Sequence, residues 1–217
     1  MNVEQARFNM VEQQIRPWDV LDTAVLDLLF EVKRERFVPE ACRELAFADL
    51  EIPLGHGESM MAPRLEARIL QDLGVKPGDT VYEVGTGSGY LTALLARRAR
   101  HVTSAEIHPD LSARARANLA AAGIGNVTLL EGDSARAPLG EKAYDAIVLT
   151  GSTPELPEAF IARLNPGGRL IAIVGDAPVM KALLVEQAGP GEIRRTELFE
   201  TLLKPLVNAQ APARFRF

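Results

Sequence analysis

The feature that most constrains the fold is a regular alternation of short apolar runs with helical segments between residues 80 and 174. The runs rich in β-forming residues are predicted as strands at 80–84, 102–107, 127–130, 146–150 and 169–174, and the segments between them as helices at 90–100, 109–122 and 157–164. Strands joined through helices need crossover connections, which produce a parallel sheet with helices on its faces. The sequence therefore predicts an α/β protein with a doubly wound, mostly parallel, Rossmann-like sheet.

The N-terminal part departs from this alternation and is predicted to be helical over residues 1–50. Apolar residues recur there at the three- and four-residue spacing of one helix face, namely at Val20, Leu21, Val25, Leu28, Leu29 and Val32. A polar, glycine-rich loop is expected at 52–59. A further helix should begin near Pro63 and end at Gly74, because glycine is the usual residue just past a helix C-terminus.

The C-terminal part is predicted to close the sheet with an antiparallel strand pair. Residues 180–187 and 192–198 flank Gly189-Pro-Gly191, which has the composition of a tight turn. The first of these runs is also compatible with a helix, since Ala182, Leu183 and Leu184 favour one. The tail 209–217 has two interpretations, a frayed end or a packing arm.

Composition narrows the classes of partner and compartment. The chain has 217 residues and a formal charge of -5, so it has no general attraction for nucleic acid or anionic membranes. No run of about 18 apolar residues is present, so no membrane span is expected. Cys42 is the single cysteine, which rules out an internal disulfide and fits a reducing compartment. We therefore expect a cytoplasmic protein, and no metal site is predicted.

The most informative motif is Glu83-Val-Gly-Thr-Gly-Ser-Gly89, which follows a predicted strand and opens a predicted helix. Glycines allow a tight turn and a close approach of backbone to a ligand, and amides at a helix N-terminus favour an electronegative group. A dinucleotide fingerprint would need glycine at position 90, where Tyr90 stands. The order acid-x-G-x-G-x-G resembles instead the first motif of class I methyltransferases, whose cofactor is S-adenosylmethionine. The loop residues expected to bind that cofactor are Glu83, Gly85, Thr86, Gly87, Ser88 and Gly89.

Two further strand ends carry acids at positions that suit a nucleoside. Glu106 lies beside Ile107 at the end of the second predicted strand, where an acid can accept hydrogen bonds from both ribose hydroxyls. Asp133 and Ser134 follow the third strand, at a position where methyltransferases commonly contact the adenine amino group. Taken singly, Glu106 could be a solvated acid and Asp133 a turn residue or helix cap. Their joint spacing with the glycine loop favours cofactor binding.

Most of the chain, from about residue 10 to 206, resembles the protein-L-isoaspartate O-methyltransferase family. The segments that carry the resemblance are Arg34-Glu-Arg-Phe-Val-Pro39, Ala46-Phe-Ala-Asp49, Ile52-Pro-Leu-Gly-His-Gly57, Glu83 to Tyr90, Tyr144-Asp-Ala-Ile-Val-Leu-Thr150, Pro154-Glu-Leu-Pro157 and Pro166-Gly-Gly-Arg-Leu170. The resemblance implies methyl transfer from S-adenosylmethionine to the carboxylate of isoaspartyl residues in damaged proteins. It implies one domain over 1–217, with N-terminal helices and a substrate loop at 1–62 and a cofactor-binding core at 63–217. His56, Gly57 and Thr150 are the implied substrate-binding residues.

The chain departs from the family's pattern in the substrate loop. The family typically reads G-H-G-Q-T-I-S-Q-P, where this chain reads Gly55-His-Gly-Glu-Ser-Met-Met-Ala-Pro63. Aligned without gaps, Met61 takes the place of the active-site serine, and Glu58 and Ser59 replace the first glutamine and the threonine. Ser59 and Met61 are therefore the candidate catalytic positions, because Ser59 could supply the missing hydroxyl if the loop slips by two residues. The close at residues 199–206 also lacks the family's usual valine-phenylalanine-valine-proline-leucine order.

Three functions remain open from the sequence. The first is an isoaspartyl methyltransferase, which needs few acid–base groups because a carboxylate is already a nucleophile. The second is a methyltransferase for another carboxylate or a small-molecule acceptor, suggested by the lost serine. The third is a cofactor-binding protein that catalyses nothing. A dehydrogenase is opposed by Tyr90.

Overall fold

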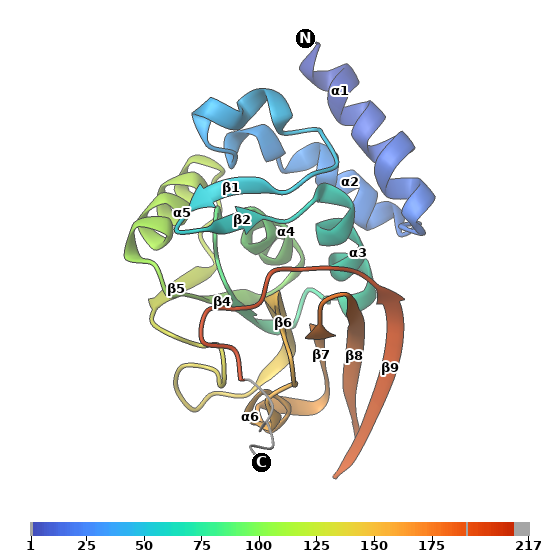
Figure 1. Cartoon of the computed structure of the whole chain (residues 1–217), viewed down its shortest axis with the longest axis vertical. Helices are drawn as coiled ribbons and strands as arrows, with labels where there is room; N and C mark the ends of the chain where they lie inside the picture. The colour runs from blue at the N-terminus through green and yellow to red at the C-terminus, as the bar shows by residue number, and fades with distance from the viewer. Residues whose placement is uncertain (1, 190, 211–217) are drawn as a thin grey trace.

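The computed structural model describes residues 2–189 and 191–210, and Figure 1 shows their arrangement. The helices are α1 Val3–Met10, α2 Thr23–Glu31, α3 Pro63–Leu73, α4 Tyr90–Arg98, α5 Pro109–Ala121 and α6 Glu158–Ile161. The strands are β1 Ile52–Gly55, β2 Glu58–Met60, β3 Thr80–Val84, β4 His101–Glu106, β5 Val127–Glu131, β6 Tyr144–Thr153, β7 Leu164–Asp176, β8 Val179–Gly189 and β9 Glu192–Glu200. Within these residues, no helix is both long enough and apolar enough to cross a bilayer.

The central sheet has the strand order β5-β4-β3-β6-β7-β8-β9. The first five strands of that order are parallel, and β8 and β9 add two antiparallel pairings at one edge. The prediction of a mostly parallel sheet that ends in antiparallel strands is confirmed. Strand order reverses direction between β3 and β6, and such a switch point is where open α/β sheets bind ligands.

The two faces of the sheet are covered unequally. Along β3, Val81 packs in a cluster with residues of α2, α3, α4 and α5, whereas its neighbour Tyr82 packs on the opposite face with Phe160 of α6. Successive strand residues point to opposite faces, so this alternation assigns each side chain to one layer. The longer helices therefore lie on one face, while the short α6 and connecting loops cover the other (Figure 1).

The N-terminal helices differ from the prediction in their boundaries. Helix α2 begins at Thr23 because the Asp22 side chain caps it, accepting hydrogen bonds from the amides of Ala24 and Val25. The expectation that Leu21 lies on the apolar helix face is wrong, since it precedes the cap and is 69% exposed. The remainder of residues 2–50 contains α1, a π-helical turn at Val11–Ile15 and short 3-10 turns, joined by non-helical segments.

The polar segment 52–59 is a β-hairpin rather than a loop. Strands β1 and β2 pair antiparallel, with Ile52 opposite Met60 and Pro53 opposite Ser59. Ile52 and Leu54 are buried while Pro53 and Gly55 are exposed, so the run has the alternation of a half-buried strand. The hairpin lies between the N-terminal helices and the sheet (Figure 1).

The structure differs from the expected helix at 157–164 and decides between strand and helix at 180–187. The helix expected at 157–164 is confined to α6, because Leu164 already pairs with Tyr144 as the first residue of β7. The run 180–187 lies in β8 and not in a helix, since β8 is hydrogen-bonded to both β7 and β9. Pro190 of the expected turn and residues 211–217 of the tail lie outside the described residues.

Candidate active site

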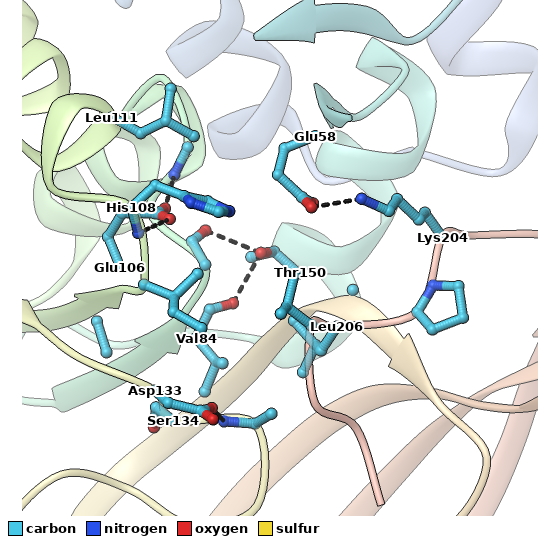
Figure 2. Close-up of a pocket in the computed structure, with 18 of the residues that line it drawn as sticks. Glu58, Val84, Glu106, His108, Leu111, Asp133, Ser134, Thr150, Lys204 and Leu206 are labelled. Carbon is cyan, nitrogen blue, oxygen red and sulfur yellow. Dashed lines mark hydrogen bonds and ion pairs between the residues drawn. The ribbon is translucent and has the colours of Figure 1, made fainter. Parts of the chain in front are cut away.

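A cleft opens at the carboxyl edge of the parallel strands (Figure 2). Together with its open mouth it encloses about 710 Å³. The ends of β3, β4 and β6 form its floor, the β1–β2 hairpin forms one wall, and residues 203–207 form another. A smaller cavity adjoins it, and the two share Leu54, Ser59, Gly85, Gly87 and Thr150 in their linings.

The glycine loop makes the sharp turn that was predicted, but its glycine amides do not face the cleft. Gly85, Gly87 and Gly89 have φ angles of 89°, 54° and 83°, a conformation that favours glycine. Their amides donate to the Ala105 carbonyl, the Glu106 carboxylate and the Thr86 carbonyl at 2.8, 2.8 and 2.9 Å. These three amides are therefore already bonded within the protein, and their contact with a ligand stays a prediction. The glycines allow close packing around the turn.

Thr150 shows how tight that packing is. Its hydroxyl lies 2.7 Å from the Val84 carbonyl and 2.8 Å from the Gly85 carbonyl, to which it donates (Figure 2). A Cβ on Gly85 would collide with the Thr150 hydroxyl oxygen. Thr150 lines both cavities, but its hydroxyl is committed to backbone. Its one proton is thus unavailable to an ionised substrate carboxylate, although the oxygen can still accept a hydrogen bond, and its role toward substrate stays a prediction.

Glu106 lies buried at the end of β4, and 4% of its surface is exposed. One carboxylate oxygen accepts from the Gly87 amide at 2.8 Å and the other from the His108 amide at 3.0 Å. Each carboxylate oxygen has two lone pairs, so both can still accept a hydrogen bond from the cleft. Glu106 and the adjacent Ile107 both line the cleft.

Asp133 and Ser134 lie at the far end of the cleft from Glu58 (Figure 2). The Asp133 carboxylate accepts from the Ala135 amide at 3.0 Å and from the Asn208 side chain at 2.8 Å. The Ser134 hydroxyl donates to the Ala137 carbonyl at 2.7 Å and bonds the Tyr82 hydroxyl at 2.8 Å. The Ser134 side chain is therefore structural, and Asp133 retains acceptor capacity.

The smaller cavity contains two buried polar atoms without partners. Glu83 is fully buried, and one carboxylate oxygen accepts from Thr92 at 2.5 Å and Ser104 at 2.6 Å while the other has no partner. The Tyr90 hydroxyl is likewise buried and unbonded. Burial raises the pKa of Glu83 to about 8, against the lowering effect of its two hydrogen bonds. These two atoms could receive a cationic or hydrogen-bonding ligand group.

The remaining residues of the glycine loop line the smaller cavity or lie in the interior. The Thr86 hydroxyl bonds Ser104 at 2.5 Å inside the protein, and Ser88 is buried with its carbonyl bonded to Asn118. Both residues line the smaller cavity. A Cβ on Gly89 would lie 3.3 Å from the Ala115 side chain of α5, and Gly89 lines neither cavity. Their contribution is to the shape of the turn.

The structure places His56 outside both cavities. Its imidazole bonds the Asp110 carboxylate at 2.9 Å and stacks on His108 with ring centroids 4.2 Å apart. The pKa of Asp110 is lowered by that hydrogen bond. Gly57 also lies outside the linings, and its carbonyl accepts from Lys204. The hairpin turn thus directs His56 toward α5 and Gly57 toward Lys204, and their contact with substrate stays a prediction.

Ser59 and Met61 both lie at the smaller cavity, but only Ser59 carries a polar group there. The Ser59 hydroxyl donates to Glu51 at 2.6 Å, and Ser59 lines both cavities. Met61 is 5% exposed, and its carbonyl accepts from the Arg34 guanidinium at 2.7 Å. Met61 thus presents an apolar surface where the family has a hydroxyl.

A buried ion pair holds the base of the hairpin in place. The Arg34 guanidinium pairs with Glu66, bonds the carbonyls of Ala46 and Met61, and lies over the Tyr90 ring at 4.9 Å. Burial raises the pKa of Glu66, and the Arg34 guanidinium opposes that rise. Since Glu66 and Tyr90 line the smaller cavity, this network connects the N-terminal segment to the site.

Sequence reasoning missed the wall formed by residues 203–208, named here the C-terminal strap. Ser152 anchors it, with its amide donating to the Lys204 carbonyl and its carbonyl accepting from Leu206, both at 2.9 Å. Gly151 is needed there, because a Cβ would lie 2.7 Å from the Leu206 side chain. Lys204 reaches the Gly57 carbonyl at 2.9 Å and pairs with Glu58. The only signal of this wall in the sequence was that residues 199–206 lack the family's usual order.

The comparisons with known proteins agree on one family. The family model described as protein-L-isoaspartate(D-aspartate) O-methyltransferase matches residues 5–211. Protein-L-isoaspartate O-methyltransferase 1 of Rhodopseudomonas palustris (strain HaA2) is 38% identical over 202 residues, covering 93% of this chain and 82% of that protein. The protein-L-isoaspartate O-methyltransferase of Anaeromyxobacter dehalogenans (strain 2CP-C) is 41% identical over 191 residues, covering 87% and 91%.

A solved structure shares the fold. A Plasmodium falciparum protein of the same family name, crystallised with S-adenosyl-L-homocysteine, superposes with a TM-score of 0.78 at 23% identity. The match covers 95% of this chain and 99% of that one. The N-terminal helices, the hairpin and the antiparallel edge therefore belong to the shared fold together with the parallel core.

Proposed function

Because the chain belongs to the protein-L-isoaspartate(D-aspartate) O-methyltransferase family, we propose that it transfers the methyl group of S-adenosylmethionine to isoaspartyl carboxylates in proteins. The observation that carries the proposal is the cleft at the switch point of the sheet. The cleft brings the glycine loop, Glu106 and Asp133 to one surface, although they are far apart in the sequence.

The chemistry of the lining fits an adenosyl amino acid. Glu106 has acceptor capacity for ribose hydroxyls, and Asp133 has it for an adenine amino group. The unbonded oxygens of Glu83 and Tyr90 suit the ammonium group of the methionine part, since a cation bound beside Glu83 would favour its ionised form and offset the rise in pKa that burial causes. When bound, the cofactor supplies a methyl group on a sulfonium, which is electrophilic without further activation.

The acceptor half requires little acid–base chemistry from the protein. An isoaspartyl carboxylate is ionised at neutral pH and can attack the methyl group without losing a proton. The protein has to align the two reactants and limit competing water. The hairpin and the C-terminal strap flank the cleft, and Met60 and Met61 add apolar surface beside it. These residues account for positioning, not for proton transfer.

The proposal is tested by a methyl-transfer assay with the full chain. S-adenosylmethionine with a labelled methyl group is incubated with an isoaspartyl peptide and with the same peptide carrying ordinary aspartate. We expect a base-labile methyl ester on the isoaspartyl peptide alone and inhibition by S-adenosylhomocysteine. Cofactor binding by calorimetry without any transfer, even at high enzyme concentration, would refute the isoaspartyl function.

Met61 gives a specific reason to test a second acceptor class. With methionine at the serine position, the smaller cavity is more apolar than the family's pattern implies. A methyltransferase for another carboxylate, on a peptide or a small molecule, would suit such a cavity. Isoaspartyl turnover slower than that of another carboxylate acceptor in a direct competition would favour this alternative.

We also propose a protein substrate and a cytoplasmic location. A formal charge of -5 disfavours a nucleic-acid acceptor, and a single cysteine suits a reducing compartment. Fractionation of cells that express the full chain checks the location.

A further inference from the structure

Lys204 is distinctive among the charged residues around the cleft. Within the described part of the chain it is the one lysine or arginine that lines either cavity, whereas three acids, Glu58, Glu106 and Asp133, line the same cleft. An acceptor carboxylate entering this cleft therefore meets a surface that is mostly repulsive. A single ammonium group is the local source of attraction.

The ammonium of Lys204 is held beside the β1–β2 hairpin, at the end of the cleft away from Asp133. It donates to the Gly57 carbonyl at 2.9 Å and pairs with Glu58, at the turn of the hairpin that also carries Ser59 and Met61 (Figure 2). An ammonium group has three donors, and these two contacts leave a third. The side chain is 42% exposed, so a ligand entering from solvent can reach it.

Resting on the proposed function, we propose that Lys204 binds the substrate carboxylate, and that Glu58 occupies this ammonium group until substrate displaces it. The exchange replaces one carboxylate by another on the same cation, so it needs no conformational change beyond rotation of two side chains. Lys204 thereby supplies the polar contact that Met61 cannot make. Glu58 is a competitor that raises the KM for anionic acceptors.

The alternative role for this ion pair is a latch that only fastens the strap to the hairpin. The two roles predict opposite changes in acceptor binding when Glu58 is removed. Removing Lys204 would break such a latch, and removing Glu58 would weaken it while leaving the Lys204 bond to the Gly57 carbonyl, so acceptor binding would weaken in both cases. If Lys204 binds the carboxylate, removing Glu58 frees the ammonium and improves binding, while removing Lys204 weakens it.

The test compares Lys204→Gln, Glu58→Gln and Lys204→Arg with native enzyme. KM and kcat are measured for the isoaspartyl peptide, and a Ki for the matching peptide with a carboxamide in place of that carboxylate. Lys181→Gln is the matched control, because Lys181 forms a similar exposed pair with Glu197 at 2.6 Å and lines neither cavity. Calorimetry with S-adenosylhomocysteine measures the affinity of the cofactor site separately.

We expect Lys204→Gln to raise the peptide KM about tenfold or more with a smaller effect on kcat, as for loss of a hydrogen bond to a charged group. Glu58→Gln should lower the KM about two- to fivefold, the range of an exposed ion pair. Lys204→Arg should stay nearer the native value. The Ki of the carboxamide peptide should be similar in native and Lys204→Gln enzymes.

Four results would overturn the inference. A rise in KM for both Glu58→Gln and Lys204→Gln identifies a latch, and so does an equal loss of S-adenosylhomocysteine affinity in both. A KM for Lys204→Gln equal to that of Lys181→Gln removes Lys204 from acceptor binding while leaving the isoaspartyl function intact. Absence of turnover by the native enzyme refutes the proposed function itself, and this inference with it.

Discussion

The backbone amide of Gly87 donates to the Glu106 carboxylate at 2.8 Å, which joins the turn after β3 to the end of β4 as one hydrogen-bonded unit. The second oxygen of Glu106 accepts from His108. A carboxylate with two backbone donors is fixed in orientation before any ligand arrives. Its remaining lone pairs are thus already directed when a ribose binds.

Glu106→Gln should weaken binding of S-adenosylmethionine and S-adenosylhomocysteine by about tenfold or more. The amide keeps only one oxygen and sets an NH2 against a backbone donor. Both the hydrogen bond to the glycine loop and the contact with the ligand are therefore weakened. Calorimetry measures the Kd. Glu131→Gln is the control, since Glu131 ends the neighbouring strand β5 but lines neither cavity. Equal affinities for the two variants would remove Glu106 from the cofactor site.

The unfolding free energy of the cofactor-free protein should fall as pH rises from about 4.5 to about 8. Burial raises the pKa of Glu83 from 4.5 to about 8, so in this window the folded state retains a proton that the unfolded state has lost. The sign of the slope is therefore negative. Urea unfolding at several pH values measures it.

Glu83→Gln isolates this contribution, because an amide does not titrate. We expect its slope to be shallower than the native slope by up to about 1.4 kcal/mol per pH unit, the value for one proton. Glu131→Gln should keep the native slope. A slope unchanged by Glu83→Gln would show that Glu83 is ionised throughout.

Glu66→Gln should destabilise the protein by about 3–5 kcal/mol, because it leaves the Arg34 guanidinium buried without a counter-charge. Urea unfolding measures the loss. Glu158→Gln removes an acid from the exposed pair with Arg195 and should change stability little. The double variant Arg34→Met with Glu66→Leu should lose less than the sum of the single changes. Additive losses would mean that Arg34 and Glu66 do not depend on each other.

Met61→Ser should raise kcat/KM for an isoaspartyl peptide while lowering stability by about 2 kcal/mol or more. The hydroxyl adds a donor for the substrate carboxylate, and removing a buried methionine side chain loses packing. Met60→Ser is the comparison, since Met60 is 4% exposed and lines the same cavity. A gain no larger than that of Met60→Ser would indicate that position 61 does not meet the acceptor carboxylate.

The parallel core was predictable from the sequence because its signals are local. Each strand of the core is a short β-rich run, and the helices α5 and α6 end near Gly123 and Pro166, so periodicity and punctuation were largely sufficient. The hairpin at 52–59 was missed since its glycines and histidine suggest a loop, while its alternating burial depends on what packs above it. Leu21 was misplaced because the cap at Asp22 outweighed the apolar spacing.

The sequence by itself determined which residues end the strands, and so it placed Gly85, Glu106 and Asp133 around one cleft. Only the tertiary structure decided where their hydrogen bonds go, since a donor such as the Gly87 amide takes whichever acceptor folding brings nearest. It also brought Lys204 to Glu58 across 146 positions of sequence. No local pattern encodes such a pair, because its geometry depends on how the strap crosses the finished sheet.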